Sequence, residues 1–268
     1  MMNNEKLLSV IVANYNNESY LRECLDSILS QEYKNLEIVI CDDCSTDSSV
    51  NIIREYEQSN PSQVRSIMNS CNKGVAATRH EAILSANGEY ITTLDSDDYY
   101  ADQDKLVEEM EIVEFFEKKN RDIIAFSNIV LVKEDKNEKV VWGTPETIKE
   151  GFIFNPIITR SCMIPRDFTM RKSLYFEVGG YDTRFPIYED WDLKIRLAHQ
   201  YEFHFTGING TAYRRHGKGL SSPPIPVHIE WLRLIFNKNI GLERNQAKQE
   251  VLTARFNEFI ASLEAAHK

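Results

Sequence analysis

Short apolar segments alternate with amphipathic ones through about the first hundred residues, and this alternation constrains the fold more than any other sequence feature. Residues 7–13 and 36–41 are nearly continuous apolar runs, the pattern of strands that are covered on both faces of a sheet. Apolar residues at helical spacing follow each run, and shorter strands are predicted at 64–68 and 90–94. Strands that alternate with helices across short connections predict an α/β fold with a doubly wound, mostly parallel sheet of Rossmann-like type.

Carboxylates crowd the end of the strand predicted at 90–94, where the chain continues with Asp95, Ser96, Asp97 and Asp98. Like charges at the end of a buried strand repel one another and lose hydration, so a compensating partner is expected. Mg²⁺ or Mn²⁺ would meet this need, because both ions prefer oxygen ligands and are commonly shared with substrate phosphates. The alternative is an acidic turn that only caps the following helix.

Polar residues also follow the first two predicted strands, at Ala13-Asn14-Tyr15 and at Asp42-Asp43. In a parallel sheet these ends meet at one edge, where ligands bind, so we expect one shared site there. The first turn contains no glycine, which excludes both the dinucleotide fingerprint and the glycine-rich phosphate loop. A bound nucleotide would therefore need another holder for its phosphates, such as a metal. The CxxC spacing of Cys41 and Cys44 also occurs in redox and zinc sites, but no second cysteine pair accompanies it.

The composition excludes several other classes of protein. With 42% hydrophobic and 27% charged residues, the 268-residue chain is typical of a globular protein with one large domain and at most a small appendage. Its net charge of -10 disfavours nucleic acid as a partner, which normally requires a basic face. We see no signal peptide and no stretch apolar enough to cross a bilayer, and the five cysteines form an odd set. We therefore expect a cytoplasmic protein without a disulfide framework.

Acidic residues gather again in the second half of the chain. A glycine pair before Tyr181 predicts a tight turn, and Glu189, Asp190 and Asp192 then open a predicted helix. These carboxylates either complement the helix N-terminus, or one of them, beside the glycine-lined loop, is a general base.

Cations follow the last predicted strand, where Arg214, Arg215 and His216 precede a glycine-containing loop that extends to residue 222. They would match phosphate groups, and the alternative is a solvated basic loop. Three prolines between 223 and 226 then indicate a boundary, followed by two helical segments with apolar stripes. These stripes either pack on the main domain or mediate dimerisation or contact with a membrane surface.

Taken in order, these motifs resemble the inverting family 2 glycosyltransferases, which have the glycosyltransferase A fold. The resemblance extends from about residue 7 to residue 220 and rests on five segments: 9–16, 36–47 with Asp42-Asp43-Cys44-Ser45-Thr46-Asp47, 72–80 with Asn72-Lys73-Gly74, 88–98, and 179–190 with Gly179-Gly180-Tyr181-Asp182 and Glu189-Asp190. Cys44 departs from the pattern, because a glycine is common there. The resemblance implies a catalytic domain at 1–222, with a nucleotide-binding part (1–100) and an acceptor-binding part (101–222), and a C-terminal helical extension at 223–268.

The resemblance also implies roles for individual residues. Nucleotide binding is assigned to Ala13, Tyr15, Asp43, Arg79, Asp95 and Ser96, with Tyr15 packed on the base and Asp43 bonded to it. Metal binding is assigned to Asp97 and His216, with Asp95 and Asp98 as further candidates. Asp190 is the expected general base. Gly180, Tyr181 and Glu189 are assigned to the loop that contacts the acceptor or the donor sugar, and Arg214 and Arg215 to the diphosphate.

The expected reaction is transfer of a hexosyl or hexosaminyl group from a nucleotide-sugar donor, first of all a UDP-sugar, to a glycan or lipid-linked acceptor. Such a role belongs to polysaccharide biosynthesis in the cell envelope, at the inner face of the membrane. A sugar nucleotidyltransferase, a glycosidase with paired carboxylates and an inactive nucleotide-sugar-binding relative of the same fold are the alternatives.

Overall fold

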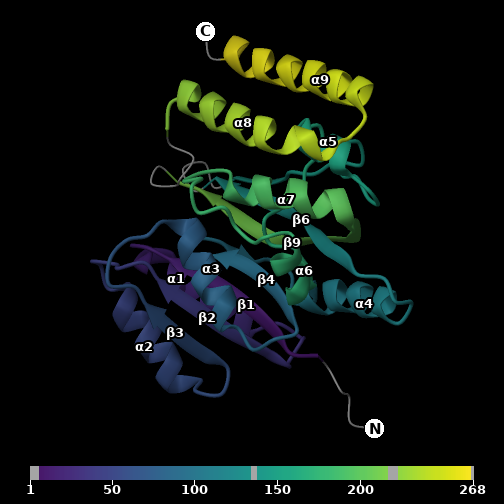
Figure 1. Ribbon diagram of the computed structural model, residues 1–268. Helices are drawn as coiled ribbons and strands as arrows, with labels where there is room; N and C mark the ends of the chain where they lie inside the picture. Colours follow the sequence, from purple (N-terminus) through teal and green to yellow (C-terminus); the bar gives the residue numbers. More distant parts are fainter. Residues whose placement is uncertain (1–5, 134–137, 217–222, 267–268) are drawn as a thin grey trace.

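A mixed nine-stranded sheet forms the centre of the protein (Figure 1). The structure is a computed structural model, which describes residues 6–133, 138–216 and 223–266. The strand order is β3-β2-β1-β4-β8-β6-β9-β5, and β7 pairs with β6 outside this path. The strands are β1 (Leu8–Asn14), β2 (Leu36–Asp42), β3 (Val64–Met68), β4 (Tyr90–Asp95), β5 (Tyr99–Tyr100), β6 (Ile123–Lys133), β7 (Glu138–Val141), β8 (Thr169–Arg171) and β9 (Glu202–Arg215). The helices are α1 (Glu18–Leu29), α2 (Ser49–Ser59), α3 (Val75–Ser85), α4 (Lys105–Glu117), α5 (Phe154–Ile158), α6 (Lys172–Glu177), α7 (Glu189–Gln200), α8 (Ile225–Asn239) and α9 (Gln246–Ala265), with a 3₁₀ turn at Ile240–Leu242.

The four strands of the N-terminal half are parallel, as the strand–helix alternation predicts. In this register the strands end at the same height in the sheet, since Ala13 of β1 lies opposite both Cys41 of β2 and Asp95 of β4. The polar residues that follow these strands therefore share one edge of the sheet, and the predicted α/β class is confirmed.

The second half of the sheet is mixed. The antiparallel strand β8 separates β4 from the long parallel pair β6 and β9. The segments predicted as separate strands at 123–126 and 129–132 form one strand, β6. Its pairing with β9 shifts register between Phe126 and Asn128, and the strand continues past this irregularity. The segments predicted at 202–205 and 210–214 likewise form one strand, β9, which brings its C-terminal end back to the edge where β4 ends.

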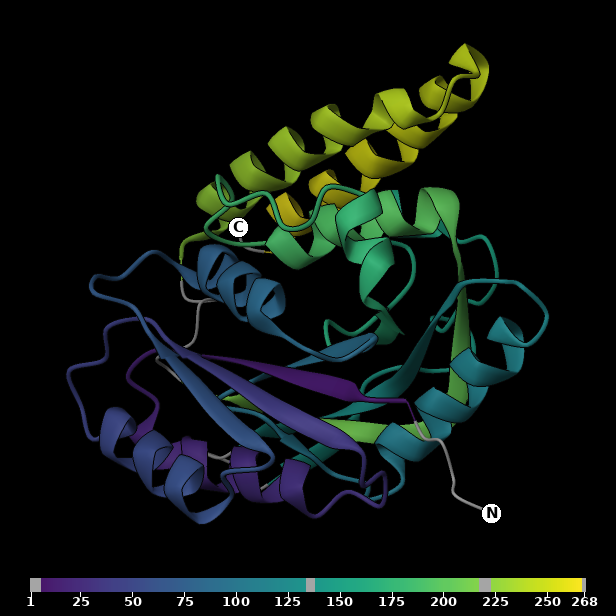
Figure 2. The same cartoon turned by 60° about the horizontal axis from the view of Figure 1, so that its bottom comes forward.

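Two apolar cores flank the sheet, with α1, α2 and α4 over one face and α3 with α5, α6 and α7 over the other (Figure 2). Successive residues of a strand point to opposite faces, so Val10 and Val12 of β1 enter the first core and Ile11 enters the second. Because both faces are covered, the central strands β1 and β2 are apolar over most of their length, which explains the two nearly continuous runs in the sequence.

The C-terminal helices α8 and α9 share the second core rather than forming one of their own. The rings of Phe236 and Phe256 stack with their centroids 4.1 Å apart. Buried Asp192 of α7 accepts hydrogen bonds from Lys238 Nζ (2.8 Å) and Asn239 Nδ2 (2.8 Å) of α8. The apolar stripes of these helices therefore pack on the main domain, as one of the two interpretations expected. The predicted domain boundary at 222/223 falls at the edge of a segment that the structure does not describe, so it stays a prediction.

Within the described residues, no helix has the length and apolar character needed to cross a bilayer. The five cysteines are free, as expected for a chain without a disulfide framework.

Candidate active site

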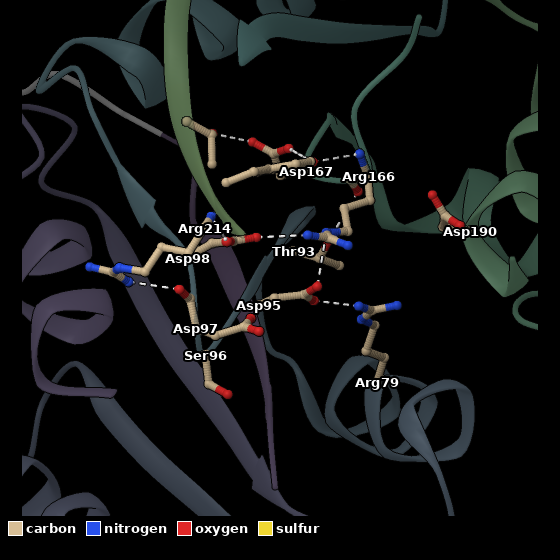
Figure 3. A network of polar contacts seen from close by, with 12 residues as sticks. Arg79, Thr93, Asp95, Ser96, Asp97, Asp98, Arg166, Asp167, Asp190 and Arg214 are labelled. Carbon is tan, nitrogen blue, oxygen red and sulfur yellow. Dashed lines mark hydrogen bonds and ion pairs between the residues drawn. The ribbon is translucent and has the colours of Figure 1, made fainter. Parts of the chain in front are cut away.

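Three carboxylates form a tight cluster where β4 ends, and we call Asp95, Asp97 and Asp98 the acidic turn (Figure 3). One oxygen from each lies within 4.8 Å of the others. Burial raises the pKa of Asp98 to about 8; Arg166 opposes this effect, and the charges of Asp97 and Asp95 add to it. Clustered carboxylates, with oxygen as the donor atom, are a suitable ligand set for Mg²⁺ or Mn²⁺.

Arg166, which the sequence did not single out, neutralises part of the acidic turn. Its Nε lies 2.8 Å from Asp95 Oδ2, and its Nη2 lies 2.7 Å from Asp98 Oδ2. The chain around Arg166 is held in place, because Thr93 Oγ1 donates to its carbonyl oxygen (2.9 Å) and its own N–H donates to Tyr213 Oη (3.0 Å). The guanidinium also lies 4.3 Å from the centroid of the Tyr213 ring.

The end of β9 lies beside the acidic turn. His216 Nε2 lies 3.0 Å from Asp97 Oδ2, and its ring stacks on Tyr20 with a centroid separation of 4.9 Å. The Arg214 N–H donates to Asp98 Oδ1 (2.8 Å), and its Nη1 donates to the Asp97 carbonyl (2.7 Å). The rest of the predicted phosphate loop, 217–222, lies outside the described residues.

Arg79 links the acidic turn to the predicted base motif. Its side chain is 2% exposed and forms ion pairs with Asp95 through Nη2 and with Glu189 through Nη1. Burial raises the pKa of Glu189, and the positive charge of Arg79 works against this effect. Arg79 thus joins α3, β4 and the start of α7. Its predicted contact with a nucleotide stays a prediction.

The residues assigned to the nucleobase lie along the same edge. Tyr15 is 47% exposed just after β1, and Ser96 accepts a hydrogen bond from Asn17 Nδ2 (2.8 Å). Asp43 is buried, and both of its oxygens are engaged by the segment 69–74: Asn69 Nδ2, Lys73 N and Gly74 N each donate to it at 2.9 Å. The carboxylate therefore holds the loop before α3 in place. A bound nucleobase would contact this carboxylate in addition to the three donors.

Asp190 lies in the first turn of α7, with Arg166 between it and the acidic turn (Figure 3). Burial opposes ionisation of Asp190, but Lys194 Nζ, 2.8 Å from Asp190 Oδ2, acts together with Arg166 and Arg79 to hold the pKa below its usual range. The carboxylate is therefore ionised at neutral pH, as a general base must be.

A cavity of about 540 Å³ opens beside Asp190, within the range of small-molecule sites. We call it the Asp190 cavity. The segment 157–166, the first turn of α7 and the end of β9 line it, and α8 and α9 contribute His228 and Phe259. The C-terminal helices thus form part of its wall.

Gly180 and Tyr181 lie behind this cavity and support it, whereas Glu189 lines it. Gly180 has a φ of +65°, and a Cβ there would lie 2.8 Å from the Tyr175 ring, so only glycine fits. Tyr181 is buried against Arg79, whose guanidinium lies 5.9 Å from the ring centroid. Contact of Gly180 and Tyr181 with a sugar stays a prediction.

Two solved structures share the fold over most of the chain. Staphylococcus aureus TarS 1-349 in complex with UDP-GlcNAc has a TM-score of 0.73 and 21% identity, covering 93% of this chain and 71% of that one. The mannosyltransferase PcManGT from Pyrobaculum calidifontis, in complex with GDP-Man and Mn2+, has a TM-score of 0.67 and 18% identity, covering 98% and 74%. At these identities the likeness shows the fold alone, and the predicted glycosyltransferase A fold is confirmed.

Sequence comparison defines the family. The model of Glycosyl transferase family 2 matches residues 9–179, well over half of the chain. The chain therefore belongs to glycosyl transferase family 2, which confirms the predicted class of enzyme.

Two curated relatives show how far the sequence similarity extends. The uncharacterised protein Rv1520 of Mycobacterium tuberculosis is 28% identical over 219 residues, or 80% of this chain and 60% of that protein. The Escherichia coli UDP-Glc:alpha-D-GlcNAc-diphosphoundecaprenol beta-1,3-glucosyltransferase WfaP is 44% identical over 95 residues, or 35% of this chain and 37% of that protein. The chain thus spans less than two thirds of the length of these relatives.

Proposed function

We propose that the protein transfers a hexosyl or hexosaminyl group from a UDP-sugar to a hydroxyl of a glycan or lipid-linked acceptor, with inversion at the anomeric carbon. The observation that carries this proposal is the position of ionised Asp190 in a cavity that adjoins the acidic turn, with Arg166 lining the cavity and contacting that turn. WfaP uses a UDP-sugar and a diphosphoundecaprenol-linked acceptor, as its name states. This supports the choice of donor and acceptor and a role in the cell envelope.

In this mechanism Asp190 removes the proton of the acceptor hydroxyl as its oxygen attacks the anomeric carbon. The bond from that carbon to the diphosphate breaks, and the nucleoside diphosphate leaves from the opposite face. Arg214 and Arg215, at the end of β9, would attract the negative charge that builds on the diphosphate. A positioned base typically contributes about 10²–10⁴-fold to the rate.

The acidic turn fits a divalent cation, which Asp97, His216 and either neighbouring carboxylate would hold. Bound there, Mn²⁺ or Mg²⁺ would neutralise charge on the diphosphate. The Mn2+ that accompanies GDP-Man in PcManGT supports this assignment. Contact of the protein with the inner face of the membrane, or dimerisation, belongs to the same proposal, since a lipid-linked acceptor would be presented there.

Donor turnover and donor binding test the two halves of this proposal separately. Asp190→Asn should abolish most transfer and UDP-sugar hydrolysis while UDP binding with Mn²⁺ is retained. Asp97→Ala should weaken Mn²⁺-dependent UDP binding in calorimetry. Glu55→Gln, which removes an exposed carboxylate paired with Arg22, is the control and should change neither. Near wild-type transfer by Asp190→Asn would exclude this base, and unchanged affinity in Asp97→Ala would exclude the metal site.

The two alternative functions predict different results in the same assays. A sugar nucleotidyltransferase would form a nucleotide sugar from a nucleoside triphosphate and a sugar 1-phosphate. An inactive binding protein would bind UDP-sugars and hydrolyse none of them. The carboxylate of Asp190 in a cavity beside the acidic turn supports the transferase.

A further inference from the structure

Arg160 has an uncommon environment in the wall of the Asp190 cavity. Its guanidinium lies 5.1 Å from the ring centroids of both Tyr188 and Trp191, and 5.7 Å from that of Phe259. Among the residues that the structure describes, no carboxylate pairs with the guanidinium and no acceptor receives a hydrogen bond from it. Aromatic rings attract a cation through their faces, but they supply neither a counter-ion nor hydrogen-bond acceptors for its five N–H groups.

Six cationic side chains line this cavity: Arg79, Arg160, Arg166, Lys194, Arg214 and Arg215. The two lining carboxylates are engaged, Glu189 by Arg79 and Asp190 by Lys194. Arg79 and Arg166 also pair with the acidic turn, and Arg214 pairs with Glu23. Arg160 differs from these cations, because the described residues provide no ion pair for it. A cation without a counter-ion attracts an anionic ligand.

The backbone holds Arg160 and its stacking partner in fixed positions. Arg160 has a φ of 56° and Tyr188 a φ of 63°, a left-handed conformation that side chains other than glycine adopt rarely. Trp191 is anchored beside them, because its Nε1 donates to the Ile157 carbonyl at 2.9 Å. The guanidinium is therefore presented to the cavity by a preorganised wall, which lowers the entropic cost of binding a ligand.

Arg160 lies on a different wall from the residues assigned to the donor diphosphate. Its aromatic partners belong to the start of α7 and to α9, whereas the acidic turn and Arg214 belong to β4, the turn that follows it and β9. Burial lowers the pKa of Arg160, and Asp190 is the carboxylate that counteracts this effect. Tyr188 and Trp191, the rings beside Arg160, flank Asp190 at the start of α7, so Arg160 lies on the wall that carries the proposed base.

We infer that Arg160 binds an anionic group, a phosphate or a carboxylate, on the acceptor molecule, beside the hydroxyl that receives the sugar. The inference rests on the proposed function, because it takes Asp190 as the base that faces this hydroxyl. A planar guanidinium matches the two oxygens of such a group with parallel hydrogen bonds. Arg160 is partly buried among aromatic rings, so this interaction is stronger than it would be on the open surface. The acceptor class is thus a glycan that carries phosphate or an acidic sugar, and a neutral oligosaccharide would leave Arg160 without a counter-ion.

Calorimetry on the protein saturated with UDP and Mn²⁺ tests this inference, because the donor site is then filled. The probes are glucose 1-phosphate, methyl glucuronide and the neutral methyl glucoside. We expect at least one anionic probe to bind about 10-fold more tightly than the neutral one, the difference typical of a hydrogen-bonded charge. Glucose 1-phosphate and methyl glucuronide distinguish a phosphate from a carboxylate. Arg160→Gln should abolish the preference, and Arg255→Gln, which removes an exposed arginine of α9, should keep it.

Each outcome decides the question. Equal affinity of the wild-type protein for charged and neutral probes overturns the inference, and this comparison needs no variant to fold. A preference that survives in Arg160→Gln also overturns it. If the wild-type protein fails to bind UDP with Mn²⁺, the proposed function falls and takes the inference with it. If UDP binds normally but anionic probes show no advantage, the inference alone fails.

Discussion

Lys194 Nζ lies 2.8 Å from Asp190 Oδ2, one turn further along α7. Lys194 also donates to the Ile164 carbonyl at 2.9 Å, so it ties the helix to the segment that lines the cavity. Burial alone would raise the pKa of Asp190, but the nearby ammonium group, together with Arg166 and Arg79, holds this pKa below its usual range. The pair keeps the carboxylate ionised, at the expense of its strength as a base.

Lys194→Met should move the acid limb of the pH–rate profile to higher pH. Without the ammonium, burial still disfavours the charged carboxylate, so the pKa of Asp190 rises and the base becomes protonated at a higher pH. The measurement is kcat/KM for UDP-sugar turnover between about pH 4 and pH 8, a range that spans the usual carboxyl values. Lys248→Met, an exposed change in α9, is the control. An acid limb that stays in place or moves to lower pH would contradict the role assigned to Lys194.

Arg166→Met should lower the melting temperature of the metal-free protein and increase the stabilisation by Mn²⁺. Arg166 contacts Asp95 and Asp98, so its removal takes away the ion pair of Asp98 and leaves Asp95 with Arg79 alone. A cation that binds only the folded state stabilises that state by mass action. In the variant, Mn²⁺ would also compensate for the positive charge lost with Arg166, so its stabilising effect should be larger than in the wild-type protein. Thermal unfolding in EDTA and in MnCl₂ measures both effects.

Arg171→Met is the matched control for this experiment. Arg171 also joins several carboxylates, pairing with Glu89, Glu117 and Asp122, but it lies at the opposite end of β4. Its loss should lower the melting temperature without any change in the response to Mn²⁺. Equal Mn²⁺ increments in wild type and Arg166→Met would show that Arg166 and the cation do not share the acidic turn.

Much of the fold could be predicted because β1 and β2 are mostly apolar runs bounded by turn residues, with helices at regular spacing between the parallel strands. The strands β5 and β8 could not, since Tyr99–Tyr100 and Thr169–Arg171 are too short to show a period. They are strands only because β9, β4 and β6 offer edges for them to pair with.

The candidate site likewise contains residues that could be predicted from the sequence and residues that could not. Asp97, Asp190 and His216 stand in recognisable local patterns, and the structure brings His216 to Asp97 across 119 residues of sequence. Arg160 and Arg166 lie in an irregular segment without periodicity. What distinguishes them is their tertiary surroundings, aromatic rings for one and carboxylates for the other, and nothing in the neighbouring sequence encodes these contacts.

Glu37→Gln should lower the free energy of unfolding at neutral pH by about 1.5–3 kcal/mol, the usual contribution of a hydrogen-bonded charge. Glu37 is 6% exposed and joins three segments, accepting from Ser9 Oγ (2.6 Å), Arg65 Nε (3.0 Å) and Asn87 Nδ2 (3.1 Å). Burial opposes its ionisation, but these donors together hold its pKa below the usual 4.5.

The sign of the pH dependence follows from that shift. A carboxyl group whose pKa is lower in the folded state stabilises the protein at pH values above the pKa of the unfolded state. This contribution is lost as the pH falls through the pKa of the folded state. Urea titrations below pH 4.5 should therefore show a shallower loss of stability in Glu37→Gln than in the wild-type protein. Parallel curves for the two proteins would mean that Glu37 is not the titrating group.

Phe256→Ala should lower the free energy of unfolding by about 3–5 kcal/mol, because the change leaves a cavity in a packed core. Phe256 is 2% exposed and stacks between Phe236 of α8 and Trp191 of α7, with centroids 4.1 and 6.2 Å away. Phe115→Ala, which truncates a ring that is 53% exposed on α4, should have a much smaller effect. If 223–268 shares one core with the sheet, urea unfolding of Phe256→Ala should remain a single transition, whereas an extension that folds independently would melt first in a separate step.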